Sequence, residues 1–122
     1  QRLRVKNKKT LDQSIIALGI PFLGRGNHQQ HIKIQQAVMS KVAGLRRFGA
    51  ASLDLAFVAA GRVDGFWEFG LSSWDIAAGI ILVKEAGGLA KGIDNKEDPL
   101  LTGNIVAGNV HIVQELQKVI NS

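Results

Sequence analysis

Residues 45–88 read LRRFGAASLDLAFVAAGRVDGFWEFGLSSWDIAAGIILVKEAGG, and this stretch decides the fold class. Its alanine-rich beginning predicts a helix over residues 49–61 that ends at a glycine. Residues 63–69 are rich in aromatic side chains and predict a strand, and a second helix is expected over residues 72–87. Helices that alternate with strands in this way indicate an α/β sandwich, in which helices cover a sheet.

The sequence on both sides continues this alternation. Further strands are expected over residues 2–6, 14–20, 89–93 and 105–107, and further helices over residues 28–43 and 110–120. Basic and apolar side chains alternate in the first of these strands, which is the pattern of a half-buried strand. Asn27 is the expected N-cap of the helix that follows it. In the helix over residues 49–61, Leu53, Phe57 and Ala60 share one apolar face. The pattern indicates one domain, or one half of a larger one.

The composition is that of a globular chain, since 46% of the 122 residues are apolar and 20% are charged. The longest run of apolar residues and glycine, Ile76 to Val83, is far too short to span a bilayer, so no membrane partner is expected. Cysteine is absent, which excludes disulfides and is compatible with a reducing compartment, and we expect a cytoplasmic protein. The chain begins at Gln1 without Met, and we expect a piece of a longer protein, although a processed terminus would look the same.

The formal net charge is +5, and the excess lies at one end of the chain. Residues 1–9 hold no acidic residue, and their basic residues are Arg2, Arg4, Lys6, Lys8 and Lys9. Such a segment could contact nucleic acid or another anionic surface. A solvated edge strand, whose lysines discourage pairing with other sheets, is the favoured interpretation. No aromatic residue is interleaved with these charges, so a platform for stacking single-stranded bases is not indicated.

Two features of the opening stretch could carry chemistry. The first predicted helix begins with Gly49, Ala50 and Ala51, whose small side chains let an anion approach the free backbone N–H groups. Asp75 lies at the start of the next helix, seven residues after Glu68 at the end of a strand. Ligand sites of α/β proteins usually form where strand ends and helix starts bring such groups to one rim of a sheet.

The acidic residues of this stretch also have a structural interpretation. An Asp in the first turn of a helix commonly serves capping and dipole roles, and spacing alone favours that role for Asp75, with Ser72 or Ser73 as the N-cap. Asp54 lies inside a predicted helix and Asp64 in a turn, and both are expected to be structural.

The histidines do not indicate a metal site. His28 and His31 lie three residues apart on one predicted helix, which could hold a metal, but no carboxylate is near. A solvated helix start is therefore favoured for this pair. His111 has no acidic or histidine partner at the spacing of metal ligands.

Short motifs of the stretch resemble those of the inositol monophosphatase family. They are GAA at residues 49–51, DGFWE at residues 64–68, WDIAAG at residues 74–79 and EAGG at residues 85–88. The last two resemble the C-terminal signature of the family, and the likeness extends more loosely over nearly the whole chain. The resemblance implies the C-terminal half of that fold, a layered α-β-α sandwich in which helices flank a mixed, mostly parallel sheet.

The resemblance also implies an activity and roles for particular residues. Enzymes of this family hydrolyse phosphate monoesters, typically of inositol, with Mg²⁺. Asp75 would then be a metal ligand, Glu68 would contact substrate hydroxyls, and Gly49, Ala50 and Ala51 would line the substrate pocket. The family often has a hydroxyl residue where Ala50 stands, so one side-chain hydrogen bond would be missing. Inositol monophosphate is the default substrate; other sugar phosphates, histidinol phosphate or a nucleotide bisphosphate are alternatives.

Two motifs of the N-terminal half of that family, a Gly-Glu pair and Asp-Pro-(Leu/Ile)-Asp-Gly-Thr, are absent here. Since Mg²⁺ takes about six oxygen ligands, one Asp cannot hold the ion. We therefore expect residues 1–122 to be a single C-terminal α/β domain of a longer enzyme, without the N-terminal metal-binding half and inactive alone. The resemblance implies a homodimer. An alternative principal role, which some bacterial relatives suggest, is an interaction protein for RNA processing or transcription.

Overall fold

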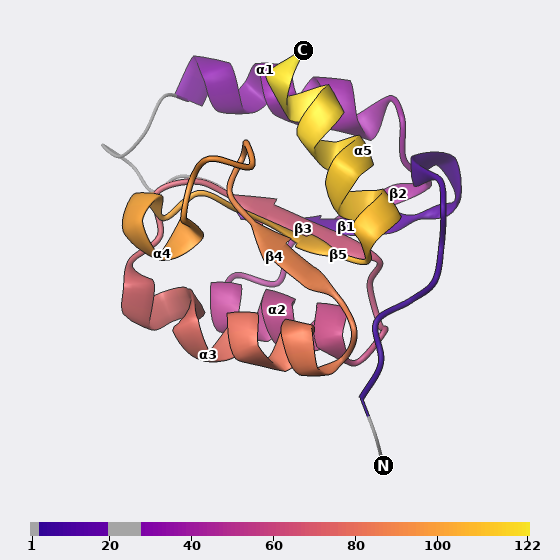
Figure 1. The fold of residues 1–122 in the computed structure, drawn as a ribbon. Helices are drawn as coiled ribbons and strands as arrows, with labels where there is room; N and C mark the ends of the chain where they lie inside the picture. The colour runs from indigo at the N-terminus through magenta and orange to yellow at the C-terminus, as the bar shows by residue number, and fades with distance from the viewer. Residues whose placement is uncertain (1–2, 20–27) are drawn as a thin grey trace.

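A sheet of five strands runs through the middle of the molecule (Figure 1). The computed structural model describes residues 3–19 and 28–122. The strands are β1 (Ile15–Leu18), β2 (Gly44–Arg46), β3 (Gly65–Glu68), β4 (Leu89–Lys91) and β5 (Ile105–Gly108). Their order is β2-β1-β3-β5-β4; β1 pairs in parallel with β2 and β3, and β5 pairs antiparallel with β3 and β4. Only β5 runs against the other strands, so the expectation of a mixed, mostly parallel sheet is confirmed.

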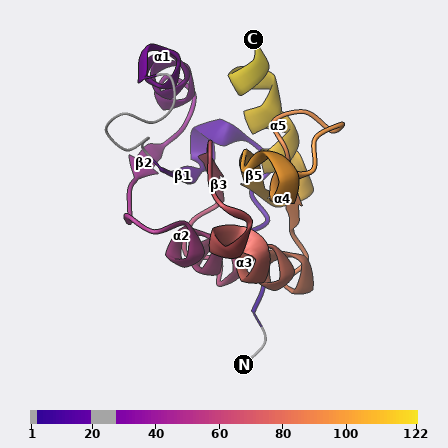
Figure 2. The same cartoon turned by 90° about the vertical axis from the view of Figure 1, so that its left-hand side faces the viewer.

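Helices cover both faces of this sheet. They are α1 (His28–Met39), α2 (Ala51–Ala59), α3 (Ser73–Glu85), α4 (Pro99–Thr102) and α5 (Val110–Asn121), with a short 3-10 helix, η1, at Leu11–Gln13. Figures 1 and 2 show α2 and α3 side by side on one face and α1 and α5 on the other. The layered α-β-α sandwich that the resemblance implies is therefore the observed architecture.

The core consists of two apolar layers, one on each face of the sheet. Strand β3 contributes to both layers, because successive side chains of a strand point to opposite faces. Phe66 packs in the layer beneath α2 and α3, Trp67 packs in the layer beneath α5, and neither is exposed to solvent. The helices of the first layer approach closely, since a Cβ atom added at Gly79 of α3 would meet the Leu55 side chain of α2 at 2.5 Å.

Both central helices end at glycines, as predicted. Gly61 follows α2 with φ +72°, and Gly87 follows α3 with φ +87°. These values lie in the left-handed region, which glycine adopts without steric cost. The helices expected over residues 49–61 and 72–87 are confirmed with slightly narrower bounds.

The strand expected at the start of the chain is wrong for the part that the structure describes. Residues 3–9 run past α3 without joining the sheet. The Val5 backbone N–H donates to a carbonyl at the end of α3 over 3.0 Å, and the Asn109 side chain donates to the carbonyls of Lys6 and Lys8 over 2.9 and 2.6 Å. The backbone groups of this segment thus form hydrogen bonds with the end of α3 and with the Asn109 side chain, and not with a neighbouring strand. The basic residues of this segment therefore do not lie on an edge strand, and the interpretation that they discourage pairing with other sheets is wrong for residues 3–9.

Helix α2 buries a different face from the one that its pattern indicates. Leu53, on the expected face, is 41% exposed, whereas Leu55 and Val58 are fully buried. Because α2 is apolar on nearly all sides, the spacing of its apolar residues does not select the buried face. The neighbouring α3 and the sheet select it instead.

The remaining differences concern short elements and boundaries. Helix α1 ends at Met39 rather than near residue 43, and β2 and α4 are two short elements that the sequence pattern did not predict. The predicted N-cap Asn27 lies outside the described residues. No helix in residues 3–19 and 28–122 is both long and apolar enough to cross a membrane.

Candidate active site

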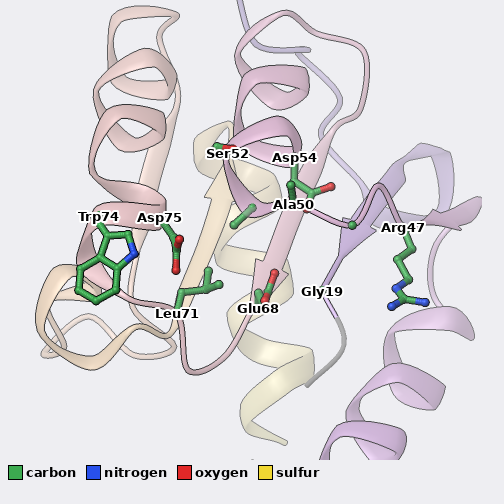
Figure 3. Close-up of a pocket in the computed structure, with 11 residues that line it drawn as sticks. Gly19, Arg47, Ala50, Ser52, Asp54, Glu68, Leu71, Trp74 and Asp75 are labelled. Carbon is green, nitrogen blue, oxygen red and sulfur yellow. The ribbon is translucent and has the colours of Figure 1, made fainter. Parts of the chain in front are cut away.

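The residues singled out in the sequence meet in one cavity at one rim of the sheet (Figure 3). The cavity has a volume of about 360 Å³ and lies where β1 and β3 end and where α2 and α3 begin. Its lining residues are Gly19, Arg47, Gly49, Ala50, Ala51, Ser52, Asp54, Glu68, Leu71, Trp74 and Asp75. Strand ends and helix starts at such a rim place polar groups around a hollow, which is where α/β proteins commonly bind ligands.

One wall of the cavity is the start of α2. Gly49 has φ +91°, a backbone conformation that favours glycine, and it turns the chain into the helix. Ala50 is the N-cap, and its methyl side chain accepts no hydrogen bond from the helix. The first backbone N–H groups of α2 therefore lack a side-chain cap, which leaves them available to a ligand oxygen at the positive end of the helix dipole. The structure thus brings Gly49, Ala50 and Ala51 together, as expected.

Glu68 and Asp75 line the cavity from two different elements. Glu68 is the last residue of β3, and its carboxyl lies against Gly19, where an added Cβ atom would overlap it. Asp75 lies in the first turn of α3 and is exposed. Figure 3 shows Leu71 between these two acidic side chains and Trp74 beyond Asp75, on the side away from Glu68. Trp74 is 81% exposed.

Asp75 also caps its own helix. Its Oδ2 accepts a hydrogen bond of 3.2 Å from the backbone N–H of Ser72, the N-cap of α3. The capping role that the spacing favours is therefore confirmed. This capping bond leaves the Asp75 carboxylate able to bind another group, because the residue is exposed and a carboxylate can accept several hydrogen bonds.

The environment of Glu68 keeps a proton on it up to nearly neutral pH. Burial, together with the negative charges of Asp54 and Asp75, raises the pKa of Glu68 to about 7. Near neutral pH the carboxyl is therefore present in both protonation states. In one state it donates a hydrogen bond and in the other it only accepts, so it can pair with a hydroxyl group in either direction.

Asp54 belongs to this site, although the sequence pattern predicted only a structural role. Its side chain is 1% exposed and lines the cavity beside Glu68. Burial raises the pKa of Asp54 to about 6, while a backbone hydrogen bond from Phe48 acts in the opposite direction. Its position one helical turn after Ala50 was a signal in the sequence, because side chains four residues apart lie on the same side of a helix.

The other acidic residue expected to be structural has that role. Asp64 is buried, and its Oδ2 accepts a hydrogen bond of 2.7 Å from the Ile15 backbone N–H at the start of β1.

The expectation for the histidines is corrected at one position. His31 is 5% exposed and burial lowers its pKa, because its side of α1 faces the core, whereas His28 and His111 are exposed.

The cavity offers the oxygen ligands that a hard cation prefers, but too few of them. Among residues 3–19 and 28–122, no three His, Asp and Glu side chains are placed to hold a metal ion. The exposed carboxylate of Asp75 has the right chemistry for one Mg²⁺ ligand. The other ligands of such an ion would have to come from outside the described residues.

Comparison with known proteins agrees with this arrangement. The sequence profile of the inositol monophosphatase family matches residues 1–122. The chain belongs to this family. It is 52% identical over 120 residues to inositol-1-monophosphatase of Rhizobium meliloti (strain 1021), which covers 98% of this chain and 45% of that protein. It is also 47% identical over 115 residues to Nus factor SuhB of Escherichia coli (strain K12), covering 94% of this chain and 43% of that protein.

The fold of this inositol monophosphatase family member matches solved structures equally well. The structure of extragenic suppressor protein suhB from Bartonella henselae has a TM-score of 0.95 and 44% sequence identity, and the match covers 100% of this chain and 47% of that one. The chain thus spans about half the length of the curated relatives that it matches.

Proposed function

We propose that this chain forms part of the active site of a Mg²⁺-dependent phosphate monoesterase, with inositol monophosphate as the first substrate to test. The observation that carries the proposal is the single cavity in which Glu68, Asp75 and the uncapped start of α2 meet. A polyol phosphate needs groups that pair with hydroxyls and groups that meet a phosphate dianion. In this cavity Glu68 would be of the first kind, and the N–H groups at the start of α2, with a cation held in part by Asp75, would be of the second kind.

Each group would have a separate role in binding. Glu68 would pair with a hydroxyl of the polyol, since its carboxyl can donate or accept a hydrogen bond near neutral pH. Gly49, Ala50 and Ala51 would line the substrate pocket, and the N–H groups of α2 would donate to substrate oxygen atoms at close range because no long side chain intervenes. Asp75 would supply one oxygen ligand to the metal.

The metal would supply what this chain lacks. When bound, Mg²⁺ neutralises charge on the phosphate and activates water. We propose that its other ligands come from an N-terminal half that the longer relatives carry, and that residues 1–122 serve as the C-terminal α/β domain of a longer enzyme. The incomplete ligand set in the described residues and the 45% coverage of the Rhizobium relative support this arrangement.

The test is an assay of the intact protein against a panel of phosphate esters. The panel contains inositol monophosphate, sugar phosphates, histidinol phosphate and a nucleotide bisphosphate. We expect Mg²⁺-dependent release of phosphate from inositol monophosphate. The Asp75→Asn variant provides the control for contaminating phosphatases. A folded intact protein that hydrolyses no member of the panel in Mg²⁺ would overturn the proposal.

A second candidate function is an interaction with nucleic acid or the transcription machinery. It is favoured by the relatives named Nus factor SuhB and by a basic surface. Arg4, Lys6, Lys9 and His111 line an open cavity of about 590 Å³, and none of them forms an ion pair within residues 3–19 and 28–122. Asn109 holds the backbone of this segment in place.

This second function can be separated from the first. Binding of RNA should survive Asp75→Asn, should weaken as salt rises, and should fall in a variant with Lys6 and Lys9 changed to Gln. The matched control is Lys33→Gln, because Lys33 is an exposed lysine on the distant helix α1. Equal RNA binding by both lysine variants would exclude the basic segment as the contact surface.

We also propose that the intact protein is a homodimer, as the family resemblance implies. Sedimentation equilibrium should give twice the mass of one chain. A single-chain mass across the concentration range would contradict this proposal without affecting the proposed chemistry.

A further inference from the structure

We propose that Arg47 makes the cavity selective for polyol phosphates that carry a second phosphate, on the side of the polyol away from the phosphate that is hydrolysed. This inference rests on the proposed function, because it concerns which esters the same cavity prefers. It is supported by the place of Arg47 at the rim of the sheet, by the open space between Arg47 and Glu68, and by the unused charge of the guanidinium. Arg47 would determine specificity and would take no part in the chemical step.

The strand order places Arg47 at one end of the cavity. Arg47 directly follows β2, Gly19 directly follows β1, and Glu68 is the last residue of β3. These strands run parallel and lie side by side in the order β2-β1-β3, so their carboxyl ends meet at the same rim. Because neighbouring strands are about 4.8 Å apart, the backbones at Arg47 and Glu68 are separated by roughly 10 Å, with Gly19 between them.

Asp75 lies at the opposite end of the cavity. Helix α3, in whose first turn Asp75 lies, packs against β4 and α4, toward the edge of the sheet that is far from β2. Figure 3 shows the same order, in which Asp75, Glu68 and Arg47 follow one another across the cavity. A phosphate at a metal on Asp75 and a polyol beside Glu68 would therefore direct the far side of the polyol toward Arg47.

The space between Glu68 and Arg47 is free of an intervening side chain from β1. Gly19 directly follows this strand, and a Cβ atom added there would overlap the Glu68 carboxyl. Any larger residue at this position would have to displace Glu68. With glycine, one cavity of about 360 Å³ has Asp75, Glu68 and Arg47 all in its lining. A single ligand can therefore reach all three side chains.

The positive charge of Arg47 is not used within the chain. The other charged side chains that line the cavity are all acidic. No carboxylate in the described part of the chain forms an ion pair with the Arg47 guanidinium, and the residues outside that part include no Asp or Glu. The guanidinium is exposed, and its planar fork can bind a phosphate through two parallel hydrogen bonds.

Two other arginines make contacts within the fold. The Arg46 Nη1 donates to the Leu45 carbonyl over 2.8 Å, and the Arg62 guanidinium lies 5.9 Å from the centroid of the Phe57 ring. Neither arginine lines the cavity. Arg46 is exposed like Arg47 and is its neighbour in sequence. Arg46→Gln is therefore the matched control, because it removes the same charge from the protein and leaves the cavity lining unchanged.

The first test compares two esters on the intact enzyme, inositol monophosphate and the inositol bisphosphate whose second phosphate lies across the ring from the first. We expect the unsubstituted enzyme to have the lower KM for the bisphosphate. Arg47→Gln should raise that KM at least about tenfold, because charged hydrogen bonds are lost away from the reacting atoms. The KM for inositol monophosphate and both kcat values should stay within about twofold. Arg47→Lys keeps the charge without the fork and should give an intermediate KM for the bisphosphate.

The ratio of the two KM values decides this test. Arg46→Gln should leave the ratio unchanged. If Arg46→Gln changes it as much as Arg47→Gln does, the effect comes from net charge and the inference is wrong. The inference is also wrong if the unsubstituted enzyme does not prefer the bisphosphate, or if Arg47→Gln raises both KM values equally. Melting temperatures should show that both variants are folded, since both arginines are exposed.

The second test measures binding without turnover. If the unsubstituted enzyme hydrolyses neither ester in Mg²⁺, the proposed function fails, and calorimetric titration with the same inositol bisphosphate then decides the role of Arg47 by itself. We expect Arg47→Gln to raise Kd at least about tenfold and Arg46→Gln to leave it within about twofold. Equal Kd values for the unsubstituted and Arg47→Gln proteins, or no binding of the bisphosphate, would overturn the inference.

Discussion

Asp75 is the residue at which a capping role and a metal-binding role meet. If it serves α3 only, Asp75→Asn should cost roughly 0.5–1 kcal/mol of stability and leave activity nearly unchanged. We expect the other outcome for the intact enzyme, because Asn still accepts the Ser72 N–H but lacks the negative charge that binds a hard cation. The Mg²⁺ concentration for half-maximal rate should rise strongly, and kcat should fall by orders of magnitude.

The melting temperature of the metal-free protein separates these outcomes. Asp75 and Glu68 carry like charges in one cavity, so removing one of them should leave the metal-free protein as stable or more stable. A less stable variant with an unchanged dependence on Mg²⁺ would restore a capping role alone and remove Asp75 from the metal site.

Glu68 should matter for binding more than for the chemical step. A hydrogen bond between a carboxyl and a substrate hydroxyl contributes at most about 3 kcal/mol. Glu68→Gln keeps the shape and a polar group, so we expect a higher KM or a changed preference among polyol phosphates, with kcat little affected. Steady-state kinetics on two polyol phosphates measure this. Loss of kcat with unchanged substrate affinity would show that Glu68 takes part in the chemical step.

The raised pKa values of Glu68 and Asp54 also predict how stability depends on pH. Their pKa values rise from 4.5 to about 7 and from 3.8 to about 6 on folding, so between these limits the folded state binds more protons than the unfolded state. The free energy of unfolding of the metal-free protein should therefore fall as pH rises from about 4 to about 7. Denaturant titrations across this range measure it.

Two variants test the origin of this pH dependence. Glu68→Gln removes one of the titrating groups and should flatten the fall in stability. Glu115→Gln is the control, because Glu115 lies on the surface of α5 in an exposed pair with Lys118 and should not change the slope. A slope that Glu68→Gln leaves unchanged would assign the pH dependence to other groups.

At the scale of elements, Asn109 joins the first residues of the chain to α5. Its Oδ1 caps α5 by accepting from the Ile112 N–H at 2.9 Å, while its Nδ2 donates to the carbonyls of Lys6 and Lys8. Asn109→Asp keeps the cap and loses both donated bonds, so we expect a loss of about 1–3 kcal/mol in the free energy of unfolding. Residues 3–9 should also become sensitive to protease.

A second Asn provides the control for this substitution. The Oδ1 of Asn104 accepts from the Gly70 N–H at 3.0 Å, and its Nδ2 donates to no described residue, so Asn104→Asp keeps the side-chain bond. We expect little change in stability for it. If Asn109→Asp is equally harmless, the amide of Asn109 does not hold the start of the chain.

At the scale of the whole molecule, the ligand count decides whether the chain can act alone. No metal-binding group of three residues exists in residues 3–19 and 28–122. We therefore expect purified residues 1–122 to show no measurable Mg²⁺-dependent hydrolysis of inositol monophosphate. The Asp75→Asn form of the same chain, prepared identically, measures the contribution of host enzymes. Turnover that disappears in this variant would show that the chain is catalytically complete.

The sequence by itself determined what depends on neighbours along the chain. The alternation of elements indicated the α/β class, glycines marked the ends of α2 and α3, and a buried aromatic strand was readable in residues 63–69. The spacing of Glu68 and Asp75 placed both at one rim, because a strand end followed at once by a helix start leaves little freedom. These features follow from backbone rules that act over a few residues.

Only the tertiary structure decided what depends on contacts between distant segments. Helix α2 is apolar on nearly all sides, so the spacing of its apolar residues does not determine which face is buried. Packing against α3 and the sheet determines that face, and it places Asp54 in the cavity. The first residues of the chain alternate between basic and apolar side chains, as in a strand. Their carbonyls at Lys6 and Lys8 instead accept hydrogen bonds from the side chain of Asn109, about a hundred residues away. The raised pKa of Glu68 likewise exists only where burial and two further carboxylates meet.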